Sequence, residues 1–200
     1  MVACARDEEQ LALKMVECSN ADEEAPCYLE YDRLKKAHAC GANVIRVLDG
    51  SWCIAREQDE SRWAVGYLMQ RGTSLEVESV RSQPRIRLQA LQAMEQLHAK
   101  GWYHGDARVA NLVLVERRDM VWVDFLGAHP IDPALKESYA YCRRTDMTKL
   151  VTSAYARVRG TQSPNMKLPR SVMNAITAYA QGSANAQAVY KCCEMDLATK

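Results

Sequence analysis

The sequence predicts an α+β protein in which a small mixed lobe precedes a larger, mostly helical lobe. Short apolar runs separated by turn signals dominate residues 1–71, whereas helical periodicity dominates residues 72–200. Two further short apolar runs inside the second region predict a tight hairpin, and polar residues flank it on both sides. We therefore expect one domain with lobes of 1–71 and 72–200.

Composition supports a folded chain. The 200 residues are 48% hydrophobic and 26% charged, which is too apolar for an intrinsically disordered protein. The net charge of +1 favours neither a nucleic acid nor an anionic membrane as partner. No apolar run is long enough for a membrane span or a secretory signal, so we expect a cytoplasmic or nuclear protein.

The eight cysteines contain no C-x-x-C pair, which a zinc site normally shows. We expect reduced thiols that act as small buried hydrophobes.

The first region reads as strand, helix and further strands. Acidic residues 22–24 and Pro26 indicate a helix start, and Gly41 indicates its end. The expected elements are a strand over 10–16, a helix over 26–40, strands over 44–48, 52–55 and 63–69, and a linker over 72–74.

The second region is predicted to be helical around the hairpin. A broad apolar stripe over 85–100 is typical of a central, buried helix. The other expected elements are hairpin strands over 112–115 and 120–123, a helix over 145–158, a helix after Pro169, and a last helix capped by Ser183.

The residues that flank the hairpin suggest a site that binds a metal ion and phosphate. A loop that runs into a tight hairpin can bring Asp106, Asn111 and Asp124 to one end, and their oxygens suit Mg²⁺ together with phosphate. Asp106 could accept a hydroxyl proton, and Arg108 could donate hydrogen bonds to phosphate. The alternative is that these residues are turn-formers at the hairpin.

Lys14 and Glu30 form a second candidate pair. Glu30, Leu34 and Ala37 share the apolar face of the predicted helix, which places the carboxylate inward. A buried carboxylate needs a cation, and Lys14 stands alone in an apolar strand. The alternative is that both side chains are solvated.

These motifs resemble those of the protein-kinase-like superfamily. The segment H-G-D-A-R-V-A-N from His104 resembles the kinase catalytic loop, and D-F-L-G from Asp124 resembles D-F-G. Leu11 to Lys14 resembles the V-A-I-K strand, 67–75 resembles the hinge, and Asp146 resembles an aspartate that braces the catalytic loop. The resemblance covers about 11–158.

The resemblance implies a two-lobe kinase fold with a truncated N-lobe, made of a short antiparallel sheet and one helix, and a mostly helical C-lobe. It implies ATP and Mg²⁺ as cofactors. The implied roles are Asp106 and Arg108 in catalysis, Lys14, Glu30, Leu68 and Gln70 in nucleotide binding, and Asn111 and Asp124 in metal binding. His104 is expected to organise backbone.

Three departures from the kinase pattern matter. No glycine precedes Lys14, so the Gly-rich phosphate loop is missing from the sequence. Gly105 replaces the usual arginine beside the catalytic aspartate, and no A-P-E motif follows. The H-G-D form occurs in aminoglycoside and choline kinases, and H-G-D-A-R-x-x-N with a short helical lobe is similar to the kinase domains of crinkler-type effectors.

We therefore expect a phosphotransferase that acts on Ser/Thr hydroxyls of a protein whose identity the sequence does not give. The alternatives are a pseudokinase or nucleotide-binding scaffold, and a small-molecule kinase. Basic residues within 136–170 indicate either a solvated helix face or a basic platform for acidic substrates. Aromatic residues are not interleaved there, so no specific nucleic-acid surface is expected.

Overall fold

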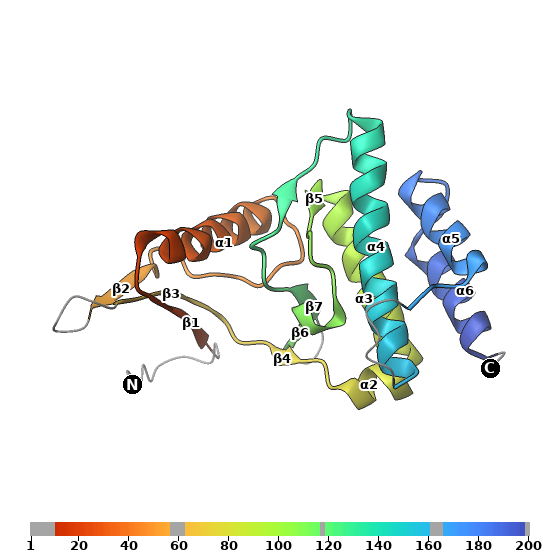
Figure 1. Cartoon of the computed structure of the whole chain (residues 1–200), viewed down its shortest axis with the longest axis horizontal. Helices are drawn as coiled ribbons and strands as arrows, with labels where there is room; N and C mark the ends of the chain where they lie inside the picture. The colour runs from red at the N-terminus through yellow and green to blue at the C-terminus, as the bar shows by residue number, and fades with distance from the viewer. Residues whose placement is uncertain (1–10, 57–62, 117–118, 161–165, 199–200) are drawn as a thin grey trace.

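The computed structural model describes residues 11–56, 63–116, 119–160 and 166–198. Within these residues the chain forms small antiparallel sheets and helices, as the sequence predicts. A sheet and one helix lie at one end of the molecule, the remaining helices lie at the other, and the hairpin lies between them (Figure 1). The strands are β1 (Leu11–Cys18), β2 (Cys53–Arg56), β3 (Trp63–Gln70), β4 (Thr73–Ser74), β5 (Trp102–Tyr103), β6 (Leu112–Val115), β7 (Asp119–Trp122) and β8 (His129–Pro130). The helices are α1 (Ala21–Ala39), α2 (Val77–Ser82), α3 (Pro84–Ala99), α4 (Lys136–Val158), α5 (Arg170–Ala180) and α6 (Ala186–Ala198), with a 3-10 turn η1 (Val109–Asn111).

The first sheet has the order β1-β3-β2, and all its pairs are antiparallel. Lys14 stands opposite Tyr67 in the register, so the two side chains share one face of the sheet. Tyr67 is fully buried there against Tyr31 of α1, with ring centroids 5.3 Å apart. Leu13 and Met15 point to the opposite face and are about half exposed. The first predicted strand is confirmed from residue 11 onward, and Gln10 lies outside the described residues.

Helix α1 begins before the predicted position. Asn20 caps it, because its side-chain oxygen accepts a hydrogen bond from the Glu23 N–H at 3.2 Å. Pro26 therefore lies inside the helix, where it removes one backbone hydrogen bond, and the prediction that the helix starts at Pro26 is wrong. The end is as predicted, since Gly41 has a φ of 74° just after the helix.

The segment 44–48 is not the strand that the sequence predicts. It makes two isolated bridges, with Val44 beside Trp122 of the hairpin and Val47 beside Met69 of β3. Because the segment passes from one sheet to the other, it forms no continuous ladder of hydrogen bonds with either sheet. The predicted linker 72–74 is likewise incorrect in part, because Thr73 and Ser74 pair with β6.

The hairpin prediction is confirmed. Strands β6 and β7 pair antiparallel over Leu112–Val115 and Asp119–Trp122, and β4 extends them to a second three-stranded sheet. The predicted turn includes Arg117 and Arg118, which lie outside the described residues. Trp122 is fully buried, and its Nε1–H donates to the Ala93 carbonyl of α3 at 3.2 Å. The hairpin is thereby fixed against the central helix.

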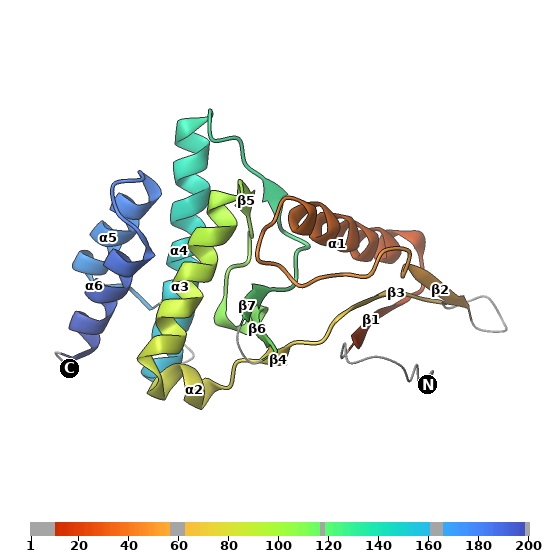
Figure 2. The same ribbon diagram turned by 180° about the vertical axis from the view of Figure 1, so that it is seen from behind.

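The helical part is longer than predicted. Helix α4 starts at Lys136 rather than Thr145, and α2 was not predicted. Helix α6 is capped by Asn185, which accepts from the Ala188 N–H at 3.0 Å, whereas Ser183 donates to the Ala178 carbonyl; the predicted serine cap is wrong. Helices α5 and α6 lie beside α3 and α4, on the side away from the hairpin (Figure 2).

One cluster of buried apolar side chains runs through both ends of the described molecule. The cysteines within the described residues are free thiols, and four of them (Cys18, Cys27, Cys142 and Cys193) are buried. Cys4 lies outside the described residues. Among the helices that the structure describes, none has the length and apolarity needed to cross a membrane.

Candidate active site

Lys14 of β1 and Glu30 of α1 form the ion pair that the sequence predicts. Lys14 Nζ lies 2.5 Å from Glu30 Oε2, and Glu30 is only 4% exposed. The other oxygen of Glu30, Oε1, accepts a hydrogen bond from the Phe125 backbone N–H at 3.3 Å. Glu30 therefore joins the sheet, α1 and the segment that follows the hairpin.

A cleft of about 410 Å³ opens beside this pair. Its volume lies within the range of small-molecule sites. The cleft brings together Lys14, Glu30, Gln70 and Asp124 from four separate parts of the chain. Its apolar walls are Ala12, Leu34, Ile45, Tyr67, Met69, Val113 and Val123.

The two residues predicted in the hinge are placed differently. Gln70 lines the cleft, whereas Leu68 alternates with Tyr67 and Met69 and so faces away from it. The Leu68 N–H donates to Ser51 Oγ at 3.1 Å, and its carbonyl accepts from the Leu48 N–H at 2.9 Å. The structure therefore does not bring Leu68 into the cleft.

Asp106 is held at the centre of the 103–111 loop. Its Oδ2 accepts hydrogen bonds from Arg108 Nε at 3.1 Å and from Asn111 Nδ2 at 3.1 Å, and Arg108 Nη2 also contacts it. Burial acts to raise the pKa of Asp106, but the Arg108 and Asn111 hydrogen bonds and the charges of Arg108 and Lys149 outweigh it and lower the pKa. The carboxylate is therefore a charged acceptor.

Asn111 lies where the chain enters the hairpin, and Asp124 lies where the chain leaves it. A hydrogen bond from the Val123 N–H to the Asn111 carbonyl, 3.0 Å long, joins the two strands at this open end. Asp124 has a φ of 61°, a left-handed conformation that costs a non-glycine residue about 1 kcal/mol or more. Asn111 Nδ2 is turned to Asp106, so its Oδ1 points away from Asp106. An amide oxygen and one carboxylate suit an Mg²⁺ ion whose other ligands are phosphate and water.

No group of three or more His, Cys, Asp or Glu side chains that could hold a metal occurs among the described residues. A metal held by Asn111 and Asp124 would need further ligands from phosphate or water.

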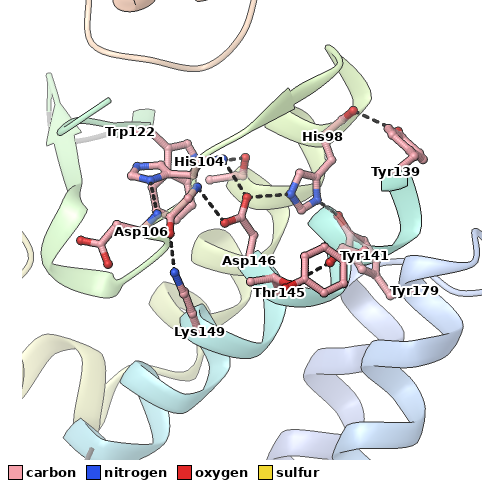
Figure 3. A network of polar contacts seen from close by, with 12 residues as sticks. His98, His104, Asp106, Trp122, Tyr139, Tyr141, Thr145, Asp146, Lys149 and Tyr179 are labelled. Atoms are coloured by element: carbon pink, nitrogen blue, oxygen red, sulfur yellow. Dashed lines mark hydrogen bonds and ion pairs between the residues drawn. The ribbon is translucent and has the colours of Figure 1, made fainter. Parts of the chain in front are cut away.

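Asp146 of α4 braces the loop from below (Figure 3). It is fully buried, and its carboxylate accepts from the backbone N–H groups of His104 at 2.8 Å and Gly105 at 3.1 Å. His98 Nε2 lies 3.1 Å from the same carboxylate. The buried, loop-bracing position predicted for Asp146 is confirmed.

His104 also organises backbone, as expected. Its Nε2 lies 3.1 Å from the Val123 carbonyl, and its Nδ1 accepts from the Asp106 N–H at 3.3 Å. The ring packs edge-on against Trp122 and Phe125. Burial lowers the pKa of His104 despite the nearby carboxylates, so the ring is neutral at pH 7.

Gly105 is required by the path of the loop. Its φ is 83°, and a Cβ at this position would lie 2.6 Å from the Gly127 carbonyl oxygen. The arginine that many kinases carry here would not fit this conformation.

Sequence reasoning gave no individual role to two basic residues that contact the loops of the site. Lys149 of α4 donates to the Gly105 carbonyl, and Arg33 of α1 donates to the Leu126 carbonyl. The available signal for Lys149 was its spacing, since it lies one helical turn after Asp146 on the same face of α4.

Three of the basic residues within 136–170 make contacts inside the protein. Arg143 stacks over the Tyr179 ring at 4.4 Å, Arg157 donates to the Leu75 carbonyl, and Arg159 pairs with Asp196. Lys149 is the one that contacts the 103–111 loop through a hydrogen bond between described residues.

Comparison with known proteins shows a similarity in fold. No protein-family model matches the sequence, and no curated protein matches it. Among solved structures, the chain is similar to the ROP18 kinase domain in complex with AMP-PNP and sucrose, with a TM-score of 0.60 and 14% sequence identity. The match covers 94% of this chain and 73% of that one. The chain therefore has a protein-kinase-like fold.

Proposed function

We propose that the protein is an ATP- and Mg²⁺-dependent phosphotransferase of the protein-kinase-like type that acts on Ser/Thr hydroxyls of proteins. The observation that carries the proposal is the convergence of the Lys14–Glu30 pair, Asp124 and Gln70 on one cleft. The AMP-PNP in the similar ROP18 structure supports a nucleotide in a fold of this kind.

In this proposal each residue has a defined task. Lys14, oriented by Glu30, neutralises and positions the nucleotide phosphates. Asp106 accepts the proton of the acceptor hydroxyl, and Arg108, which donates to Asp106 in the structure, would donate to the transferred phosphate. Asn111 and Asp124 would hold Mg²⁺, which supplies charge neutralisation at the phosphates.

The acceptor class, subfamily, cellular location and division into lobes are proposed from the sequence. Arg108 stands two residues after Asp106, where protein serine/threonine kinases carry a lysine, and this favours protein acceptors over aminoglycoside- or choline-type acceptors. The similarity of H-G-D-A-R-x-x-N to crinkler-type effector kinases is part of the proposal, as is residence in the cytoplasm or nucleus. So is the division into a truncated N-lobe (1–71) and a helical C-lobe (72–200).

A nucleotide-binding scaffold without turnover is the second candidate. It is favoured by the hinge, where the backbone groups of Leu68 and the N–H of Gln70 are already bonded within the protein, the latter to the Arg46 carbonyl at 2.8 Å. An adenine ring would find fewer backbone partners there, so nucleotide affinity would be low.

Titration calorimetry with ATP, with and without Mg²⁺, tests the metal assignment. We expect Asp124→Ala to abolish the Mg²⁺-dependent part of ATP binding, because the remaining amide oxygen cannot replace a carboxylate. The matched control is Asp119→Ala, which removes an exposed carboxylate from the same hairpin. Equal Mg²⁺ dependence in Asp124→Ala and the parent protein would refute the assignment.

A phosphate-transfer assay with Asp106→Asn separates the two candidates. Loss of transfer in Asp106→Asn, with ATP binding retained, supports the phosphotransferase. ATP binding without transfer in the parent protein supports the scaffold. Transfer that persists in Asp106→Asn contradicts the role of Asp106.

A further inference from the structure

A chain of buried hydrogen bonds leads from α5 to the 103–111 loop (Figure 3). The Tyr179 hydroxyl lies 2.7 Å from His98 Nδ1, and His98 Nε2 lies 3.1 Å from Asp146 Oδ2. Asp146 in turn accepts from the N–H groups of His104 and Gly105. Tyr179 and Asp146 are fully buried and His98 is 1% exposed, so the links of this chain are shielded from water.

The chemistry of the partners sets the direction of each bond. Asp146 accepts from two backbone N–H groups, as a carboxylate does. The His98 nitrogen that faces it, Nε2, must therefore carry the proton, and in a neutral ring Nδ1 then presents a lone pair. Tyr179 must donate its hydroxyl proton to Nδ1.

Burial favours the same protonation states. It lowers the pKa of His98, with the adjacent Asp146 opposing, and it raises the pKa of Tyr179, with Arg143 opposing. His98 is thus a neutral ring and Tyr179 a neutral donor at pH 7.

Charged and aromatic groups from α4 fix the position of Tyr179. The Arg143 guanidinium stacks 4.4 Å from the centroid of the Tyr179 ring, and it also lies over Tyr139. The Tyr139 hydroxyl donates to the His98 carbonyl at 3.1 Å. The charged groups that act on His98 are Asp146 and Arg143 from α4 and Glu95 from its own helix.

We propose that Tyr179 is a positioning residue for the 103–111 loop. Its hydroxyl holds His98 as a neutral ring with Nε2–H directed at Asp146, so that the Asp146 carboxylate stays on the loop amides. This inference rests on the proposed function where it concerns turnover, because it takes that loop as the one that carries Asp106.

Removal of the hydroxyl has a defined physical effect. In Tyr179→Phe the buried Nδ1 lone pair has lost its donor, which is unfavourable for the neutral ring. Protonation of Nδ1 does not relieve this, because phenylalanine offers no acceptor for the added N–H and burial opposes the charged ring. The His98 ring is then no longer held with Nε2–H toward Asp146, and the Asp146 carboxylate loses the partner that keeps it on the N–H groups of His104 and Gly105.

The structural arm of the test does not depend on activity. Nitrogen-15 NMR of the parent protein should show a protonated Nε2 and an unprotonated Nδ1 at His98. In Tyr179→Phe we expect the fixed Nε2–H tautomer of His98 to be lost in part and amide exchange of His104 and Gly105 to accelerate about fivefold or more. A proton on Nδ1 in the parent protein, or unchanged exchange in the variant, overturns the inference.

Tyr155→Phe is the matched control. Tyr155 is also a buried tyrosine of the helical part, and its hydroxyl donates to the Cys193 carbonyl at 3.0 Å. Its loss should lower stability comparably but leave His98 and the loop amides unchanged. If the two variants accelerate amide exchange of His104 and Gly105 equally, Tyr179 contributes only packing, and the inference is overturned.

The kinetic arm uses the phosphate-transfer assay. We expect Tyr179→Phe to lower kcat about tenfold and leave the KM for ATP unchanged. The reason is that the 103–111 loop moves while the cleft lined by Lys14 does not. A rise in the KM for ATP with unchanged kcat contradicts the inference. If Asp106→Asn retains full transfer, the proposed function fails, whereas the His98 and exchange results still decide the role of Tyr179.

Discussion

At the scale of single residues, Gly105 shows how the backbone selects an amino acid. Its φ of 83° and its contact with the Gly127 carbonyl leave no room for a side chain. The same residue is fixed from two sides, since Asp146 binds its N–H and Lys149 binds its carbonyl. The loop therefore has little freedom to adjust around a larger residue.

We predict that Gly105→Ala destabilises the protein by about 2 kcal/mol or more, through the left-handed backbone and the overlap with Gly127. Urea denaturation measures this loss. Gly160→Ala is the matched control, because Gly160 has a φ of 63° but open space around its Cβ position. If both variants lose the same stability, the overlap with Gly127 contributes nothing.

Prediction at the scale of single residues succeeded where the sequence shows a buried charge that requires an oppositely charged partner. Glu30 on an apolar helix face needs a cation, and Lys14 in an apolar strand supplies it. It failed where tertiary geometry decides the outcome. Leu68 lies on the far face of β3, and the positions of Lys149 and Arg33 depend on how helices approach loops that are distant in the sequence.

At the scale of elements, the hairpin and most helices follow from periodicity, whereas the segment 44–48 does not. Its apolar pattern is that of a strand, but its neighbours are two different sheets. A strand pattern reports burial of alternate side chains and says nothing of whether one partner strand runs alongside. The same reason explains why Thr73 and Ser74, which look like a linker, form β4.

The β4–β6 contact gives an element-scale prediction. A Cβ at Gly72, just before β4, would lie 2.4 Å from Cγ2 of Val113 in β6. We predict that Gly72→Ala costs about 1–3 kcal/mol by overpacking, and that Val113→Ala offsets part of this cost in the double variant. Thermal or urea unfolding of the four-member cycle measures the coupling. Strictly additive losses would contradict a direct contact between the two positions.

At the scale of the whole molecule, two buried histidines link the core to the site. His98 and His104 are both neutral because burial lowers the pKa of each, although carboxylates near them oppose this. The facing charged groups are Asp146, Arg143 and Glu95 for His98, and Asp146, Asp106 and Asp124 for His104. Protonation of His104 would also turn Nδ1 from an acceptor into a donor facing the Asp106 N–H.

These two rings predict how stability depends on pH. Both have a lower pKa in the folded protein than the value of about 6.5 in an unfolded chain. As pH falls below about 6.5 the unfolded state binds protons that the folded state does not, so the free energy of unfolding decreases until the folded pKa values are reached. Urea midpoints between about pH 7.5 and pH 5 measure the effect, and His104→Gln should flatten the profile because it removes one of the two buried rings. A parent midpoint that stays constant over this range would show that the buried rings do not stay neutral.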